Sequence, residues 1–283
     1  MKILVTGATG FLGANLISWL VKNTNHEIIA SSRNLKKSRK FDWITEVKFV
    51  EFDMENAKNA EISNFYSPDI LVHYAWTNYR EINSPHHILE NLPNSFNFVR
   101  TLVEQGIKNI AVIGSGFEYG MINGSLNENL NTNPVSFYAI AKDTLRKTLS
   151  IYLENKCVIY KWIRIFNVFG DGIHPKSLFG LLGNAIKNGN KSFPMSGGEQ
   201  VRDYIEVGKL SEYTGKIILQ NKINGIINCC SGKPITVKKL TKNIISKKKS
   251  DIKMDLGFYP YSPIEPMEYW GDTEKLKMIL NQG

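Results

Sequence analysis

Short apolar runs alternate with amphipathic stretches along the first 165 residues. Lys2–Thr6 reads Lys-Ile-Leu-Val-Thr, and after it Leu12, Leu16, Trp19 and Leu20 recur at helical spacing. The same pattern predicts strands at 2–6, 27–31, 47–50, 69–74, 110–113 and 158–165, and helices at 11–21, 87–104 and 137–153. Alternation of this kind is typical of βαβ units. We therefore expect an α/β fold with a Rossmann-type, doubly wound parallel sheet that carries helices on both faces.

The pattern becomes irregular after Asn167. Glycine and proline are frequent there, the helical stretches are short, and 258–266 is a proline-rich loop. We expect a dinucleotide-binding Rossmann domain over 1–168, to which 201–232 returns. The remainder of 169–283 is expected to form mainly a smaller, discontinuous substrate-binding lid at the carboxyl edge of the sheet, where open α/β sheets bind ligands.

Composition and charge argue against nucleic-acid, metal and membrane partners. The chain of 283 residues carries 35 Lys and Arg against 26 Asp and Glu, a formal net charge of +9. The basic residues are scattered, and runs such as Lys36-Lys37 are interpreted as solvated surface, so no nucleic-acid partner is expected. The three cysteines and five histidines lack ligand spacing, which argues against a metal. No signal peptide or long apolar run is seen, so we expect no membrane partner and a cytoplasmic location.

A glycine turn between the first strand and the first helix is the candidate cofactor site. Gly7, Gly10 and Gly13 lie in the run Thr-Gly-Ala-Thr-Gly-Phe-Leu-Gly, with Phe11 and Leu12 at the start of the helix. Glycine lets the backbone approach a pyrophosphate, and a helix N-terminus favours its negative charge. A glycine triplet alone is a weak signal, but its position between a strand and a helix indicates a dinucleotide site.

The end of the second strand bears on which dinucleotide binds. An acidic residue there contacts the ribose hydroxyls of NAD, whereas an arginine accommodates the 2′-phosphate of NADP. This chain has Ser31, Ser32 and Arg33 at that place and no acid. We therefore favour NADP(H), with NAD(H) left open. The alternative interpretation of Arg33 is a surface arginine after a strand.

Tyr138 and Lys142 are the candidate catalytic pair. Their spacing of four places both side chains on one face of a helix. An ammonium beside a phenol stabilises the phenolate, so the phenol exchanges protons more easily. Together with the glycine turn, the pair predicts hydride chemistry at a carbonyl or alcohol carbon, with the tyrosine handling the proton.

These motifs resemble the extended branch of the short-chain dehydrogenase/reductase superfamily, the NAD-dependent epimerase/dehydratase family that acts on nucleotide-activated sugars. The resemblance covers nearly the whole chain. It implies a catalytic role for Ser115 beside Tyr138 and Lys142, a sugar-nucleotide contact at Asn167 and a diphosphate contact at Arg202. It also implies cofactor contacts at Asp53, Ala75, Trp76 and Asn91, although Trp76 stands where a small residue is common. Tyr138 and Lys142 are expected to contact the cofactor as well. His174 is interpreted as a loop residue near the sugar, with an acid/base role left open.

The segment around the serine narrows the reaction. Family 4,6-dehydratases carry an Asp-Glu pair directly after the Ser/Thr, and this chain has Gly116 and Phe117 there. A dehydratase is therefore not expected, and Glu118, one position later, is expected to point elsewhere.

We favour NADPH-dependent reduction of the 4-keto group of a nucleotide-activated deoxysugar, in a surface-polysaccharide sugar pathway. The alternative is a 4-epimerase with bound NAD(H), and a non-catalytic NADP- or RNA-binding protein is a third interpretation. The resemblance further implies a homodimer through the two long helices at 87–104 and 137–153.

Overall fold

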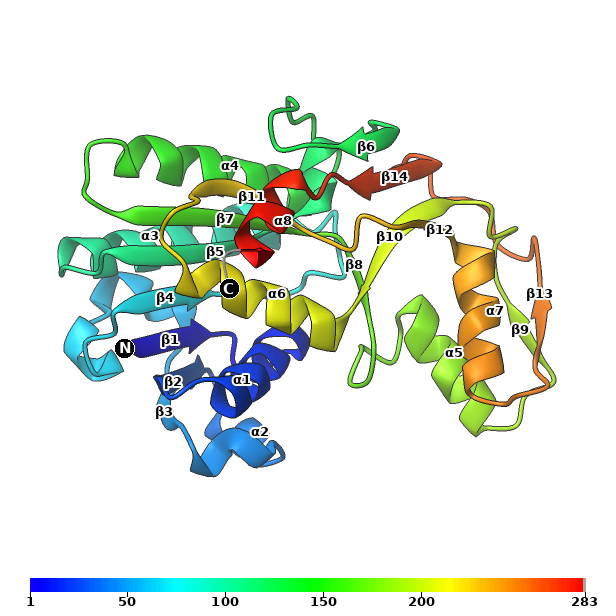
Figure 1. Cartoon of the computed structure of the whole chain (residues 1–283), viewed down its shortest axis with the longest axis horizontal. Coiled ribbons are helices and arrows are strands. Elements are labelled where there is room, and N and C mark those ends of the chain that lie inside the picture. Colours follow the sequence, from blue (N-terminus) through cyan, green and yellow to red (C-terminus); the bar gives the residue numbers. More distant parts are fainter. Residues whose placement is uncertain (282–283) are drawn as a thin grey trace.

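A seven-stranded parallel sheet forms the centre of the computed structural model, which describes residues 1–281 (Figure 1). The strand order is β11-β7-β5-β4-β1-β2-β3, and every neighbouring pair is parallel. The strands are β1 (Lys2–Thr6), β2 (Glu27–Ser32), β3 (Lys48–Glu51), β4 (Ile70–His73), β5 (Asn109–Ser115), β7 (Ile159–Ile165) and β11 (Gly225–Cys229). The Rossmann-type sheet predicted from the sequence is confirmed.

Helices cover both faces of this sheet. On one face α1 (Phe11–Asn23), α6 (Val207–Leu219) and α8 (Glu274–Leu280) pack together, and on the other α3 (Leu92–Glu104) packs against α4 (Phe137–Leu153). Each helix buries an apolar stripe, because its leucines and isoleucines recur at helical spacing. The central strands are consequently apolar on both sides and almost fully buried.

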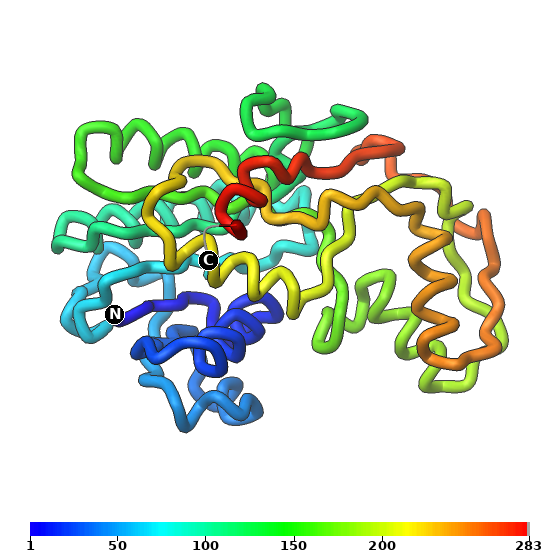
Figure 2. Tube along the Cα trace, in the orientation of Figure 1, coloured from blue at the N-terminus to red at the C-terminus, as the bar shows by residue number. Residues whose placement is uncertain are grey.

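A smaller part of the molecule lies beyond the carboxyl ends of the strands. It contains β6 (Gly124–Leu126), β8 (Asn167–Phe169), β9 (Ser192–Pro194), β10 (Val201–Glu206), β12 (Pro234–Thr236), β13 (Lys253–Asp255), β14 (Glu268–Gly271), α5 (Leu178–Lys187) and α7 (Val237–Lys247). Helices α5 and α7, with β9 and β13, enclose a separate apolar cluster. Figure 2 shows the chain crossing between the two parts several times, so the smaller part is discontinuous in sequence.

Short helical turns connect several of these elements. They are α2 (Leu35–Ser38), 3-10 turns at Asp42–Thr45, Met54–Asn59, Ile62–Phe65 and Gly116–Tyr119, and a π-helical turn at His87–Asn91. The single helix predicted over 87–104 is therefore divided into this π turn and α3. Pro93 follows the junction, and its missing N–H cannot continue the hydrogen-bond ladder.

The outer face of α4 carries exposed apolar side chains. Phe137, Ile140 and Ile151 are 42%, 37% and 74% exposed in the single chain. The homodimer through α3 and α4 stays a prediction.

Candidate active site

One cleft of about 790 Å³ opens at the carboxyl edge of the large sheet. The loops after β1, β2, β3, β4 and β5 line it on one side, and several residues between 165 and 177, with Glu265, line it on the other. Of the residues singled out in the sequence, those in this lining are Gly7, Gly10, Phe11, Leu12, Gly13, Ser31, Ser32, Arg33, Asp53, Ala75, Trp76, Asn91, Ser115, Tyr138, Lys142, Asn167 and His174. Arg202 is absent from the lining.

At one end of the cleft, the backbone segments around the glycine turn lie too close together to admit a side chain. Gly7 has a φ of +67°, and a side-chain carbon there would lie 2.9 Å from the backbone nitrogen of Ala75. A side-chain carbon at Gly13 would lie 2.5 Å from the Gly7 carbonyl oxygen. Helix α1 begins at Phe11 without a side-chain cap, so its first N–H groups are free to bind an anion. The residues present therefore fit a dinucleotide pyrophosphate.

The end of β2 offers hydroxyl groups and positive charge to the same cleft. The Ser31 and Ser32 hydroxyls are buried and have no hydrogen-bond partner among residues 1–281. Arg33 and Lys37 both line the cleft. The sequence predicts solvated surface at Lys37. In the structure the turn of α2, capped by Asn34, brings Lys37 to the cleft. Across from them, the Asp53 carboxylate accepts the Glu55 N–H at 3.2 Å.

The candidate catalytic groups come from two neighbouring elements. Ser115 ends β5, and Tyr138 and Lys142 lie one turn apart in the first half of α4, which Ser136 caps. The Lys142 ammonium donates a hydrogen bond to the Ile113 carbonyl at 2.8 Å. Burial lowers the pKa of Lys142 to about 7, and the Glu118 charge opposes that shift. Burial raises the pKa of Tyr138 to about 12, against the effect of the nearby Ser115 hydroxyl. At neutral pH the phenol therefore holds its proton and can donate it.

Asn91 fixes the loop that follows β4. Its side-chain oxygen accepts the Thr77 N–H at 3.1 Å, and its side-chain nitrogen donates to the Thr77 carbonyl at 2.9 Å. This places Trp76 and Thr77 against the cleft. The π-helical turn brings Asn91 into reach, and this turn has no local sequence signal apart from Pro93.

The opposite end of the cleft holds the predicted substrate residues. The Asn167 amide donates to the Asp203 carbonyl at 3.2 Å and also contacts the Tyr269 hydroxyl. His174 accepts the Lys176 N–H at 3.1 Å. Its pKa is lowered by partial desolvation and by the charges of Arg80 and Lys176, so the ring is neutral at pH 7.

Arg202 lies behind a carboxylate that does line the cleft. The residue is 4% exposed, and its guanidinium donates to the backbone carbonyls of Val201 and Met267 and pairs with Glu265 at 3.2 Å. The sequence did not mark Glu265, because it stands in the irregular loop 258–266 where no pattern distinguishes one carboxylate.

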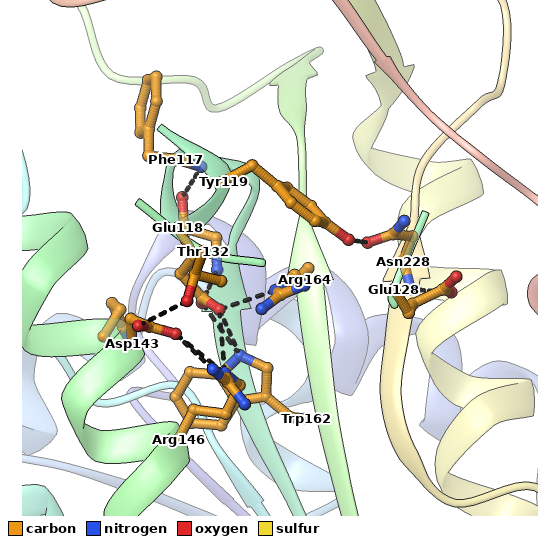
Figure 3. A network of polar contacts seen from close by, with 12 residues as sticks. Phe117, Glu118, Tyr119, Glu128, Thr132, Asp143, Arg146, Trp162, Arg164 and Asn228 are labelled. Carbon is orange, nitrogen blue, oxygen red and sulfur yellow. Dashed lines mark hydrogen bonds and ion pairs between the residues drawn. The ribbon is translucent and has the colours of Figure 1, made fainter. Parts of the chain in front are cut away.

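Glu118 does not line the cleft, as expected. Figure 3 shows its side chain in a polar network with Arg146, Trp162 and Arg164. Its carboxylate accepts the Ser115 N–H at 2.8 Å, the Trp162 indole N–H at 3.0 Å and the Arg164 Nε at 2.8 Å. Arg146 of α4 lies 3.8 Å away and pairs with Asp143. Burial raises the pKa of Glu118, and Arg164 opposes the shift. The network thus joins β5, β7 and α4 directly beneath the candidate catalytic groups.

Residues 1–281 contain neither a metal-binding cluster nor a membrane-spanning helix. No group of three or more His, Cys, Asp or Glu side chains in this range is arranged to hold a metal ion. Within the same range, no helix has both the length and the apolarity needed to cross a bilayer.

Comparison with known proteins agrees with this geometry. Over 273 residues the chain is 28% identical to dTDP-6-deoxy-L-talose 4-dehydrogenase (NAD(+)) of Aggregatibacter actinomycetemcomitans, covering 96% of this chain and 99% of that protein. It is 26% identical over 257 residues to dTDP-4-dehydro-6-deoxyglucose reductase of Escherichia coli, covering 86% and 80% of the two chains.

A solved structure is similar over nearly the whole length. It is the UDP-N-acetylglucosamine 4-epimerase from Methanobrevibacter ruminantium M1 in complex with UDP-N-acetylmuramic acid, with a TM-score of 0.84 and 25% identity. The match covers 98% of this chain and 91% of that one. Residues 3–230 match the model of the NAD dependent epimerase/dehydratase family, a range that takes in the glycine turn, the Ser/Tyr/Lys set and Arg202. The chain therefore belongs to the NAD dependent epimerase/dehydratase family.

Proposed function

We propose that this protein reduces the 4-keto group of a nucleotide-activated 6-deoxysugar with a reduced nicotinamide cofactor. The observation that carries the proposal is that Ser115, Tyr138 and Lys142 line one cleft together with the glycine turn and the free N-terminus of α1. The two curated relatives named above support the substrate class, because their names specify a 4-dehydrogenase and a reductase of deoxysugar nucleotides.

Each catalytic side chain has a distinct task in this proposal. A bound nicotinamide supplies the hydride that reaches the keto carbon. Tyr138 donates its phenolic proton to the oxygen on which negative charge develops. Ser115 hydrogen-bonds the same oxygen and polarises the carbonyl. Lys142, as an ammonium, stabilises the phenolate that remains.

Net consumption of cofactor separates reduction from epimerisation. We expect loss of reduced-nicotinamide absorbance when the protein is mixed with a panel of dTDP-, CDP-, GDP- and UDP-linked 4-keto-6-deoxyhexoses. An epimerase would interconvert sugars at carbon 4 without net change in the cofactor. The similarity to a 4-epimerase structure makes this the alternative outcome to measure in the same samples.

The end of β2 supports NADP(H) as the cofactor, whereas the name of one relative specifies NAD(+). Arg33 and Lys37 offer positive charge, and no acid ends the strand. The Ser31 and Ser32 hydroxyls have no hydrogen-bond partner within residues 1–281. We expect Arg33→Ala to weaken NADPH binding about tenfold or more and to leave NADH binding unchanged, since a hydrogen bond to a charged group contributes about 1.5–3 kcal/mol. Equilibrium titration of cofactor fluorescence measures the dissociation constants of NADPH and NADH.

Lys36→Ala is the matched control for this prediction. Lys36 is an exposed neighbour of the same charge, and it does not line the cleft. Its removal is expected to leave both binding constants unchanged. Tighter binding of NADH than of NADPH by the unaltered protein would assign the site to NAD(H) instead.

Glu265 is expected to compete with the substrate for Arg202, which we propose binds the diphosphate. An arginine grips a phosphate with two parallel hydrogen bonds, and one guanidinium nitrogen is here engaged by Glu265 at 3.2 Å. Glu265→Gln removes the competing charge and keeps the shape. We expect the preferred nucleoside diphosphate to bind about fivefold tighter, because a partly exposed ion pair is worth about 1 kcal/mol.

Calorimetric titration with dTDP, CDP, GDP and UDP measures this effect. Glu268→Gln is the matched control, because Glu268 is an exposed carboxylate three residues further on that does not line the cleft. Unchanged or weaker binding by Glu265→Gln would mean that Arg202 takes no part in holding the diphosphate.

A further inference from the structure

Trp76 contacts the candidate catalytic lysine through the face of its indole ring. The Lys142 ammonium nitrogen lies 3.8 Å from the centroid of that ring. Lys142 is 4% exposed, and among residues 1–281 its ammonium makes one hydrogen bond, to the Ile113 carbonyl. An ammonium that is removed from water and leaves two N–H groups without an acceptor gains substantially from an aromatic face.

The indole is held in place by a buried histidine. The Trp76 ring nitrogen lies 3.1 Å from His87 Nδ1, and Asn91 Nδ2 lies 3.2 Å from the same atom. Both of these groups can only donate, and His87 Nε2 faces the Glu81 carbonyl at 3.1 Å, which can only accept. The contacts therefore define one tautomer, with the proton on Nε2 and a lone pair on Nδ1 for the indole N–H.

The same two rings also position the phenol. Tyr138 meets Trp76 edge to face, with 6.2 Å between ring centroids, and meets His87 in the same way at 5.4 Å. Such arrangements are the preferred geometry of aromatic pairs. Trp76 thus contacts both members of the Tyr/Lys pair, and His87 fixes its orientation.

We propose that Trp76 is a positioning residue, locked by His87, whose indole face holds the Lys142 ammonium in its charged form beside Tyr138. The inference deepens the proposed function and rests on it, because it assigns the residue that keeps the catalytic lysine usable. No carboxylate contacts Lys142 among residues 1–281, so the ring takes the place that an acidic partner would otherwise fill.

The other titratable groups around Lys142 do not replace this contact. Glu118, beneath β5, is a carboxylate whose charge raises the pKa of Lys142. His73 on β4 is neutral, because burial lowers its pKa to about 3. Burial also lowers the pKa of His87. Tyr138, on the same helix, is protonated at neutral pH because burial raises its pKa to about 12.

Titration of Lys142 tests the proposal without any substrate. Full-length protein labelled with ¹³C at lysine Cε is titrated by NMR, and the Lys142 signal is assigned by its loss in Lys142→Met. We expect a midpoint near pH 7 in the unaltered protein and a midpoint about one pH unit lower in Trp76→Leu, since a desolvated cation over an indole is worth about tenfold. Trp76→Phe keeps a face and is expected to fall between the two.

The reduction rate provides a second readout. As pH rises, the rate in Trp76→Leu is expected to decline about one pH unit earlier than in the unaltered protein, so that the ratio of the two rates changes with pH. Tyr213→Leu is the matched control, because it removes a ring beneath Lys209, which lies outside the cleft.

An unchanged Lys142 midpoint in both Trp76 variants, or a rate lowered equally at every pH, would overturn the proposal. If the Lys142 midpoint shifts in Trp76→Leu but the unaltered protein reduces none of the sugars, this inference holds and the proposed substrate is wrong.

Discussion

Tyr138→Phe is expected to lower the rate of sugar reduction by about a thousandfold while cofactor affinity stays the same. The substitution removes the one phenolic oxygen and keeps the ring packed against Trp76 and His87. General acid catalysis by a positioned side chain contributes roughly 10²–10⁴-fold to a rate. Because burial raises the pKa of Tyr138 to about 12, the phenol is protonated across the neutral range, and its loss is felt at every pH in that range.

Single-turnover reduction and cofactor titration measure the two quantities separately. Tyr160→Phe is the matched control, because the Tyr160 hydroxyl is buried without a hydrogen-bond partner among residues 1–281 and lies outside the cleft. That variant is expected to keep full activity. A Tyr138→Phe protein within a few-fold of normal turnover would remove the proton-transfer role assigned to this residue.

Glu118→Gln is expected to cost about 3–5 kcal/mol of stability, the largest structural effect that we anticipate. Glu118 and Arg164 are both 0% exposed, and Nη1 and Nη2 of Arg164 have no partner among residues 1–281. Removing the carboxylate charge leaves the guanidinium buried and uncompensated, which is far more costly than removing the whole pair. The variant should melt on the order of 10 °C lower.

The double variant Glu118→Gln/Arg164→Met separates charge from shape. It removes both charges and keeps the amide oxygen that can accept the Ser115 N–H, so it should recover more than half of the lost stability. Arg100→Gln breaks an exposed pair with Glu104 and is expected to change stability by less than about 1 kcal/mol. Chemical denaturation of these three variants and of the unaltered protein provides the comparison, and a double variant no more stable than Glu118→Gln would contradict the account.

The large sheet and the catalytic pair could be predicted from the sequence because their signals are local. Strand β1 is a continuous apolar run, and the four-residue spacing of Tyr138 and Lys142 places them together on any helix. The cleft residues Gly7 and Arg33 were likewise found because they follow directly on strands, whose carboxyl ends meet at one edge.

The residues that the sequence did not reveal depend on contacts between distant segments. Glu265 approaches Arg202 across 63 positions of the chain, and Lys37 reaches the cleft only through the short turn of α2. The part played by Trp76 follows from His87, which a π-helical turn directs inward. No spacing rule anticipates these arrangements, since each depends on how irregular backbone packs in three dimensions.

Transfer of deuterium tests the central claim most directly. The protein is incubated with its nucleotide-4-keto-6-deoxysugar substrate and a reduced nicotinamide cofactor that carries deuterium at the transferable position. The product is then examined by mass spectrometry and proton NMR. The account predicts one deuterium per product molecule, bound to carbon 4 of the sugar, and almost none in the same time with Tyr138→Phe. A product without the label, or with the label on another carbon, would contradict it.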